Sequence, residues 1–212
     1  MSIETHIHRF IPGTAAGAPT LLLLHGTGGD ESALVTIGER IAPGAALLGV
    51  RGNVSEHGSN RYFRRIAEGV FDIDDLLKRT ADLADFVEAA SEQYAFALSS
   101  LIAVGYSNGA NIAASTLLLR PGVIQRAVLF RAMMPLEPEQ APVLEDTKVL
   151  IAAGRFDDLI PNESTERLAE ALRTAGADVT LSWQNVDHRL TQDDLHVAHE
   201  WIAHQAGAHK DD

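Results

Sequence analysis

The sequence contains no cysteine. This absence excludes disulfide bonds, a thiolate nucleophile and any zinc or iron–sulfur site held by cysteine. It also fits a protein of a reducing compartment, and we expect a cytoplasmic location.

Positive charge is scarce, with 17 Lys and Arg against 29 Asp and Glu, for a formal net charge of −12. Such a chain is repelled by nucleic-acid phosphates and by acidic lipid surfaces, so we expect no nucleic-acid partner. Long apolar runs are missing too: residues 21–24 form one of the longest, far too short to cross a bilayer. Residues 1–6 lack a basic segment followed by an apolar core, so we expect neither a signal peptide nor membrane insertion.

Apolar residues are plentiful, at 46% of a 212-residue chain. This is enough for one sizeable core, and two full domains would be cramped. We therefore expect residues 1–212 to form a single domain with its core over about 20–204. A short edge strand within residues 5–11 and a disordered C-terminal tail would complete the chain.

Short apolar runs alternate with longer segments of helical periodicity. The runs predict strands at residues 20–24, 45–50, 100–104, 127–130, 148–153 and 179–183. The longer segments predict helices at residues 31–41, 72–94, 110–119, 163–175 and 191–204. This alternation predicts an α/β fold with a mostly parallel, doubly wound sheet and helices on both faces. Functional residues should then collect at the carboxyl ends of the strands.

The most informative motif is Gly105-Tyr106-Ser107-Asn108-Gly109, between a predicted strand and a predicted helix. A G-x-S-x-G motif in this context is the signature of a nucleophile elbow, a tight turn that presents the serine hydroxyl to a substrate. Ser107 is therefore the candidate nucleophile. The N–H of Asn108, at the start of the helix, can face a developing negative charge.

A serine hydroxyl needs a base, and the base needs an orienting carboxylate. In α/β-hydrolases these follow the serine in the order acid, then histidine. Asp157 and Asp158 compete for the acid role after the strand at 148–153, and His188 lies after the strand at 179–183. His188 is the only histidine in the loop where the base is expected.

The oxyanion hole needs a second N–H, and the turn His25-Gly26-Thr27-Gly28-Gly29 after the first core strand can supply it. Thr27 is our candidate. An ordinary βα turn is the simpler alternative. A phosphate loop is a poor one, because no third glycine and no G-K-[ST] follow.

Nine histidines raise the question of a metal site. His199 and His204 lie five residues apart, off a common helical face, although His196 and His199 could share one. Solvated histidines explain this segment better. We predict no metal and no cofactor.

A basic and aromatic segment follows the strand at 45–50 and leaves from the active edge of the sheet. It contains Arg51, Arg61, Tyr62, Phe63, Arg64 and Arg65. We predict Arg51, Tyr62 and Phe63 as substrate contacts that hold an aromatic or anionic group. A salt-bridged surface or a homodimer contact would explain this segment equally well. Met133 and Met134 are candidates for an apolar pocket wall, with core packing as the alternative.

Three motifs together resemble the phospholipase/carboxylesterase family of small, capless α/β-hydrolases related to acyl-protein thioesterases. They are Leu24 to Asp30, Gly105 to Gly109, and Gly154-x-x-Asp157-x-x-x-Pro161. The similarity runs from about residue 20 to 203. Residues 51–77 look most like a bacterial branch linked to esterases of hydroquinone and catechol detoxification.

The resemblance implies a cofactor-free hydrolase of carboxylic esters or thioesters, with Ser107 as nucleophile, Asp157 as acid and His188 as base. It places the oxyanion amides at Thr27 and Asn108, and Pro161 favours Asp157 over Asp158. A small-molecule ester of short acyl or aromatic character is the expected substrate, with a thioesterase or a lysophospholipase-type enzyme as the alternative. A dienelactone-type hydrolase with a cysteine nucleophile is excluded by the composition.

One position departs from the family pattern, which has glycine before the catalytic histidine. Here Asp187 precedes His188, and its side chain could shift the loop, raise the pKa of the imidazole or narrow the pocket. A binding protein on a hydrolase scaffold is therefore the second hypothesis.

Overall fold

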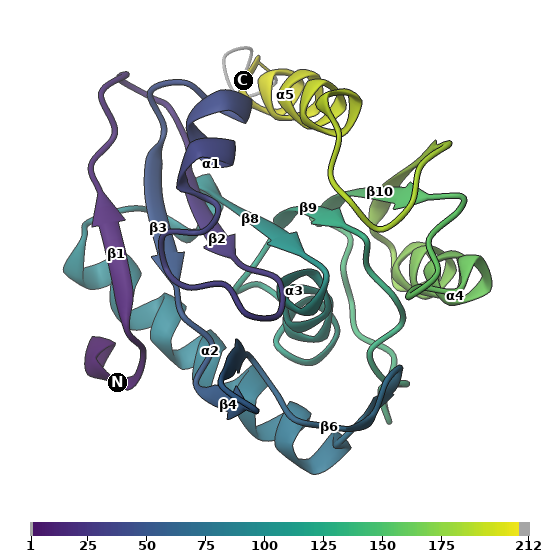
Figure 1. Cartoon of the computed structure of the whole chain (residues 1–212). Helices are drawn as coiled ribbons and strands as arrows, with labels where there is room; N and C mark the ends of the chain where they lie inside the picture. Colours follow the sequence, from purple (N-terminus) through teal and green to yellow (C-terminus); the bar gives the residue numbers. More distant parts are fainter. Residues whose placement is uncertain (1, 208–212) are drawn as a thin grey trace.

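A computed structural model describes residues 2–207. Its centre is a seven-stranded sheet in the order β1-β3-β2-β8-β9-β10-β11, coloured from purple to green across Figure 1. All neighbouring pairs are parallel except β1 with β3. The strands of this sheet are β1 His8–Ile11, β2 Thr20–Leu24, β3 Ala46–Val50, β8 Leu101–Tyr106, β9 Arg126–Phe130, β10 Lys148–Gly154 and β11 Asp178–Gln184.

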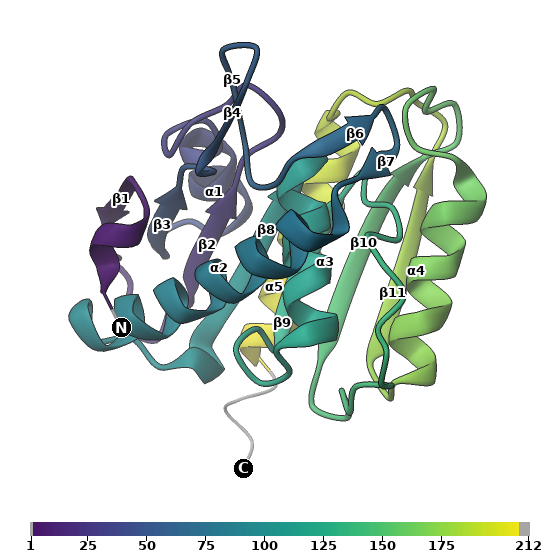
Figure 2. The same cartoon turned by 90° about the horizontal axis from the view of Figure 1, so that it is seen from below.

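Within residues 2–207, five α-helices cover both faces of the sheet. They are α1 Val35–Ile41, α2 Ile73–Gln93, α3 Asn108–Leu119, α4 Asn162–Thr174 and α5 Gln192–Gly207. In Figure 2, α2, α3 and α4 lie in front of the sheet, and α1 and α5 lie behind it. The architecture is the predicted α/β-hydrolase fold.

The core consists of two apolar clusters separated by the sheet. Along β2, Leu22 and Leu24 face the cluster of α2, α3 and α4, whereas Leu21 and Leu23 face that of α1 and α5. Side chains of a strand alternate between faces, so a strand covered on both sides reads as an unbroken apolar run. For this reason the apolar runs in the sequence predicted the central strands.

The segment between β3 and α2 forms two small hairpins. One pairs β4 Val54–Glu56 with β5 Ser59–Arg61, and the other pairs β6 Arg65–Ala67 with β7 Val70–Phe71. Both stand at one edge of the main sheet in Figure 2. Within residues 2–207, these hairpins are the only strands outside the main sheet. No large cap domain covers that edge in the described residues.

The strand order reverses direction between β2 and β8. From β2 the chain moves outward to β3, then returns past β2 to β8 and continues the other way. In open α/β sheets, ligands bind at such a switch point, at the carboxyl ends of the strands. Thr27 follows β2 and Ser107 follows β8, so both candidates lie there.

The two ends of the chain refine the expectations. The edge strand within residues 5–11 is β1, shorter than predicted because Ile3–Thr5 form a 3₁₀ helix. Helix α5 continues to Gly207, and the predicted disordered tail beyond that lies outside the described residues. Within residues 2–207, no helix is both long enough and apolar enough to span a membrane.

Candidate active site

Ser107 sits at the sharp turn between β8 and α3. Its backbone φ is 53° and ψ is −112°, a region that residues other than glycine rarely occupy. The turn is held from both sides, because the N–H of Ser107 donates to the carbonyl of Phe130 and its own carbonyl accepts from the N–H of Asn111, each at 2.9 Å. The strain is therefore maintained by the ends of β9 and α3.

The two glycines of the elbow are required by close backbone contacts. A Cβ on Gly109 would lie 2.0 Å from the carbonyl oxygen of Leu24, at the end of β2. A Cβ on Gly105 would lie 2.6 Å from the Cα of Ala110. The elbow thus packs α3 directly onto neighbouring strands, which leaves no room for side chains at these positions.

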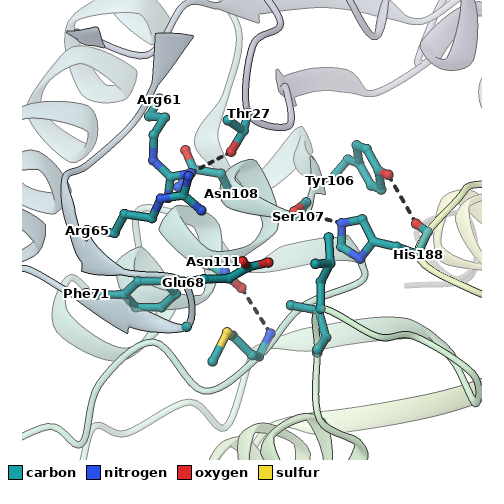
Figure 3. A pocket seen from close by; sticks show the side chains of 14 residues that line it. Thr27, Arg61, Arg65, Glu68, Phe71, Tyr106, Ser107, Asn108, Asn111 and His188 are labelled. Carbon is teal, nitrogen blue, oxygen red and sulfur yellow. Dashed lines mark hydrogen bonds between the residues drawn. The ribbon is translucent and has the colours of Figure 1, made fainter. Parts of the chain in front are cut away.

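Three predicted residues form a continuous hydrogen-bonded chain. The distance from Ser107 Oγ to His188 Nε2 is 3.0 Å, and from His188 Nδ1 to Asp157 Oδ2 it is 2.8 Å. The side chain of Asp157 is 2% exposed and that of His188 is 16% exposed. The nucleophile candidate, a base and a carboxylate from three separate loops therefore meet at one sheet edge, and Ser107 and His188 face each other in Figure 3.

The structure distinguishes the two adjacent aspartates after β10. Asp157 Oδ1 accepts hydrogen bonds from the N–H groups of Leu159 at 2.9 Å and Ile160 at 3.0 Å. These bonds fix the carboxylate so that its second oxygen faces His188. Asp158 is exposed and takes no part in the chain.

The loop after β2 is fixed by buried side chains. His25 Nδ1 donates to the carbonyl of Gly26 at 2.7 Å, and His25 Nε2 accepts from the N–H of Gly52 at 3.0 Å. This pairing requires the neutral ring, and burial lowers the pKa of His25, which favours the same form. Arg61 Nη1 donates to Thr27 Oγ1 at 2.7 Å and so fixes the residue proposed for the oxyanion hole.

A cavity of about 340 Å³ opens beside Ser107. Its floor comes from the elbow, and its walls come from the β6–β7 hairpin and the loops after β9 and β10 (Figure 3). The lining residues are Thr27, Arg61, Arg65, Glu68, Gly69, Phe71, Tyr106, Ser107, Asn108, Asn111, Met133, Leu159, Ile160 and His188. Four of the five residues proposed for the triad and the oxyanion hole thus border one cavity. The fifth, Asp157, has a buried side chain.

None of the predicted substrate contacts lines this cavity. Arg51 points to Glu31, with hydrogen bonds of 2.6 and 2.9 Å, because that ion pair satisfies it at the surface of the loop. Phe63 is 0% exposed, in the α2–α3 cluster. Tyr62 is buried as well, and its hydroxyl donates to the carbonyl of Val50 and accepts from the N–H of His25. Met134 packs in the same cluster, which is the alternative stated for it, whereas Met133, the other candidate for the pocket wall, lines the cavity.

The segment nevertheless supplies the cavity through other residues. Arg61, Arg65 and Phe71 line it, and the N–H of Tyr62 donates to Asn108 Oδ1 at 2.7 Å. Asn111 also lines the cavity and accepts from the N–H of Met133. Asn111 lies one helical turn after Ser107, and that spacing could have marked it as a residue of the same helix face.

Asp187 does not enter the cavity lining. Its carboxylate accepts from the backbone N–H of Arg189 at 2.9 Å and pairs with the Arg189 guanidinium at 2.7 Å. The hydrogen bonds from Arg189 lower the pKa of Asp187, so its charge is satisfied on the outer side of the loop. Both hydrogen bonds that join Ser107, His188 and Asp157 are kept with this aspartate in place.

The histidines of α5 have other partners. His196 pairs with Glu200, and His199 Nδ1 lies 3.0 Å from the carbonyl oxygen of Ile41. Among the described residues 2–207, no three histidine, aspartate or glutamate side chains are grouped so that they could hold a metal ion.

The fold and the elbow define an α/β-hydrolase. The chain belongs to the dienelactone hydrolase family, whose sequence profile matches residues 54–210. The elbow residue is serine and the chain has no cysteine, so this membership does not imply a cysteine nucleophile.

Named relatives agree with the hydrolase class. The chain is 45% identical to the hydrolase MhqD of Bacillus subtilis, over 92% of this chain and 96% of the relative. It is 42% identical to the carboxylesterase of Bacillus cereus, with a TM-score of 0.91 over 95% of this chain and 94% of the other. It is 27% identical to the esterase YpfH of Escherichia coli, over 76% and 71% of the two chains. These relatives support the resemblance to carboxylesterases and identify the chain as an esterase.

Proposed function

We propose that this esterase cleaves carboxylic esters through an acyl-enzyme on Ser107. The hydrogen-bonded chain from Asp157 Oδ2 through His188 to Ser107 Oγ carries the proposal. A hydroxyl is a weak nucleophile at neutral pH, and a histidine within hydrogen-bond reach can take its proton during attack. This chemistry needs no metal or cofactor.

The proposed reaction has two halves. Ser107 Oγ attacks the ester carbonyl while its proton passes to His188 Nε2, and Asp157 stabilises the resulting imidazolium. His188 then gives the proton to the departing alcohol. In the second half, His188 takes a proton from water, the hydroxide attacks the acyl-enzyme, and Ser107 regains its proton as the acid leaves.

The negative charge on the carbonyl oxygen needs donors in both halves. The N–H of Asn108 begins α3, where the helix dipole favours an anion, and Thr27 faces the same cavity from the loop after β2. Within residues 2–207, the backbone hydrogen bonds of turns, loops and helix caps use neither the N–H of Thr27 nor the N–H of Asn108 as a donor. Two such donors beside Ser107 support their role as the oxyanion hole.

The cavity favours small substrates. Its volume of about 340 Å³ lies near the lower end for small-molecule sites. Phe71, Met133 and Ile160 supply apolar surface for a short acyl chain or an aromatic ring. Short acyl and aromatic esters are therefore the proposed substrates, ahead of long-chain lysophospholipids.

Hydrolysis of p-nitrophenyl acetate and butyrate tests the proposal. We expect the wild-type protein to hydrolyse both and Ser107→Ala to be slower by at least about a thousandfold, because the covalent step is removed. Ser91→Ala, on α2, is the matched control, because its hydroxyl only donates to the carbonyl of Glu88. Wild-type rates in Ser107→Ala would refute the proposal.

The same assay separates the alternatives. Thioesters with the same acetyl and butyryl groups test for a thioesterase, and p-nitrophenyl palmitate tests for a long-chain lipid hydrolase. Higher kcat/KM on the thioesters would replace the ester assignment, and higher kcat/KM on the palmitate would replace the assignment of short acyl groups. A wild-type protein inactive on all of them and unlabelled by an organophosphate would favour the binding-protein hypothesis.

A further inference from the structure

A buried ion pair lies behind the active site, outside the cavity lining. Arg131 directly follows β9, and Asp194 lies in the first turn of α5. Both side chains are 0% exposed, and two hydrogen bonds of 2.9 and 2.7 Å join the guanidinium to the two carboxylate oxygens. Removing two charges from water is costly, so such a pair needs further hydrogen bonds to be tolerated.

Those further bonds go to the backbone around His188. Arg131 Nε donates to the carbonyl of Asp187 at 3.2 Å, and Nη2 donates to the carbonyl of Arg189 at 2.7 Å. Nη1 also donates to the carbonyl of Ala152 on β10 at 3.1 Å. With the two bonds to Asp194, all five N–H donors of the guanidinium are used.

The carbonyl of His188 itself is held by the elbow. Tyr106, the residue before Ser107, donates its hydroxyl to this carbonyl at 3.1 Å, which is the dashed line to the right in Figure 3. The carbonyls of residues 187, 188 and 189 are thus each bound by a side chain from the end of β8 or β9. The loop of the base is tied to the strands that position the nucleophile.

The backbone of Arg131 is itself strained to reach this position. Its φ is +56°, which is rare for a residue with a long side chain, and its N–H donates to the carbonyl of Ala152. Strain of this kind persists only where surrounding contacts compensate for it, and it concentrates at functional sites. Asp194 completes the link, because its Oδ2 also accepts from the N–H and hydroxyl of Thr191 at the start of α5.

We propose that Arg131 is a positioning residue for His188, acting with Asp194 and Tyr106. The inference rests on the proposed role of His188 as base. Arg131 touches neither substrate nor reacting atoms; it fixes the backbone that aims the imidazole at Ser107. An arginine is required because only its planar fork can bind a carboxylate and three separate carbonyls at once.

Arg131→Lys is the direct test, because it retains the charge opposite Asp194 and loses the fork. We expect kcat on p-nitrophenyl acetate to fall roughly tenfold to a hundredfold, with KM changed by less than about twofold, because misplaced catalytic groups slow the chemical step. Ile202→Ala is the control for stability: it weakens the packing of α5 in the cluster behind the sheet without touching the loop. We expect it to lower Tm and leave kcat within about twofold.

A spectroscopic signature separates positioning from simple destabilisation. The proton on His188 Nδ1, bound to Asp157, should give a downfield proton resonance in the wild-type protein and in Ile202→Ala. It should be broadened or lost in Arg131→Lys. An unchanged resonance and unchanged kcat in folded Arg131→Lys would overturn the inference and leave the proposed function standing. Activity that persists in Ser107→Ala would instead remove the proposed function.

Tyr106→Phe decides the matter if Arg131→Lys does not fold. It deletes only the hydroxyl that binds the carbonyl of His188. We expect kcat to fall about threefold to tenfold at unchanged KM, together with a change in the same resonance. A wild-type kcat and resonance in Tyr106→Phe would count against the inference.

Discussion

Asp157 and Asp187 show how differently two carboxylates near one histidine can be employed. Asp157 is 2% exposed and bound to His188 Nδ1, whereas Asp187 is 42% exposed and bound to Arg189. Sequence proximity to the base would favour Asp187, but the hydrogen bond joins His188 to Asp157 and supports the proposed orienting role of Asp157.

This difference gives a paired prediction. Asp157→Asn should lower kcat on p-nitrophenyl acetate by at least about a thousandfold, because the amide cannot support the imidazolium. Asp187→Asn should change kcat by less than about twofold, because the carboxylate that it removes pairs with Arg189. Steady-state kinetics at neutral pH measures both, and a larger loss in Asp187→Asn than in Asp157→Asn would reverse the assignment.

At this scale the sequence predicted the meeting of Ser107, Asp157 and His188 from the elbow motif, the acid-then-histidine order of α/β-hydrolases and the loops after two later strands, because parallel strands end at one edge. The family resemblance, through Pro161, favoured Asp157 over Asp158. The sequence predicted only part of the cavity wall, since Met133 lines the cavity and the aromatic candidates do not. Tyr62 and Phe63 lie in a short irregular segment where no periodicity shows which side chains turn inward, and both are buried. Arg131 was missed because its role depends on partners 56 to 63 residues away in the chain.

The elbow is the element on which the site depends, and its glycines allow α3 to pack closely on β2 and β8. Gly109→Ala would place a methyl group 2.0 Å from the carbonyl oxygen of Leu24. We expect it to lower the free energy of unfolding by at least about 3 kcal/mol, because β2 or α3 must move.

Urea denaturation of purified variants measures this effect. Gly122→Ala is a suitable comparison: its φ is +91°, but a Cβ there would meet nothing within 4 Å. It should cost only about 1 to 2 kcal/mol, the strain of a left-handed conformation. An equal decrease in the free energy of unfolding in the two variants would contradict this prediction, because close packing at the elbow would then add no cost to that of replacing a glycine.

The main strands and helices were predicted within a few residues, since buried parallel strands and amphipathic helices leave clear patterns. Two features were not. Helix α1 begins at Val35 and not at residue 31, because residues 31–34 form turns. The hairpins β4–β5 and β6–β7 have strands of two or three residues, too short for any periodicity. The His57-Gly58 turn, with positive φ at both positions, was their one available signal.

For the whole molecule, the free energy of unfolding at acidic pH is linked to a buried histidine just before β1. His6 is 5% exposed and packs against Phe86, with ring centroids 4.9 Å apart. Burial, with smaller contributions from Arg79 and His8, lowers the pKa of His6 from 6.5 to about 4. Below pH 6.5 the unfolded chain therefore takes up a proton that the folded chain accepts only near pH 4.

Stability should accordingly decrease as the pH falls from about 6.5 to 4, by at most about 3 kcal/mol from this residue. Denaturant unfolding across this range should show a shallower decrease in His6→Phe than in the wild-type protein. His196→Asn is the control, because it removes an exposed histidine and leaves His6 in place. Identical slopes in all three proteins would contradict the assignment.

Fold class and the order of the main elements were predictable from composition and alternation, and the esterase class followed from the motifs. The arrangement that holds His188 was not, because it depends on buried polar contacts between distant loops. Those contacts, and not the G-x-S-x-G motif alone, distinguish a site whose base is aligned with its nucleophile from a hydrolase fold in which the two are not aligned.

The most direct test of the central claim is the rate at which a fluorophosphonate labels Ser107, followed by peptide mass spectrometry. Labelling requires a serine activated by its base and is independent of the physiological ester. We predict a single adduct on the peptide that contains Ser107, formed at least about a hundredfold more slowly in His188→Ala. No adduct on Ser107 in a wild-type protein that still hydrolyses esters would contradict the account.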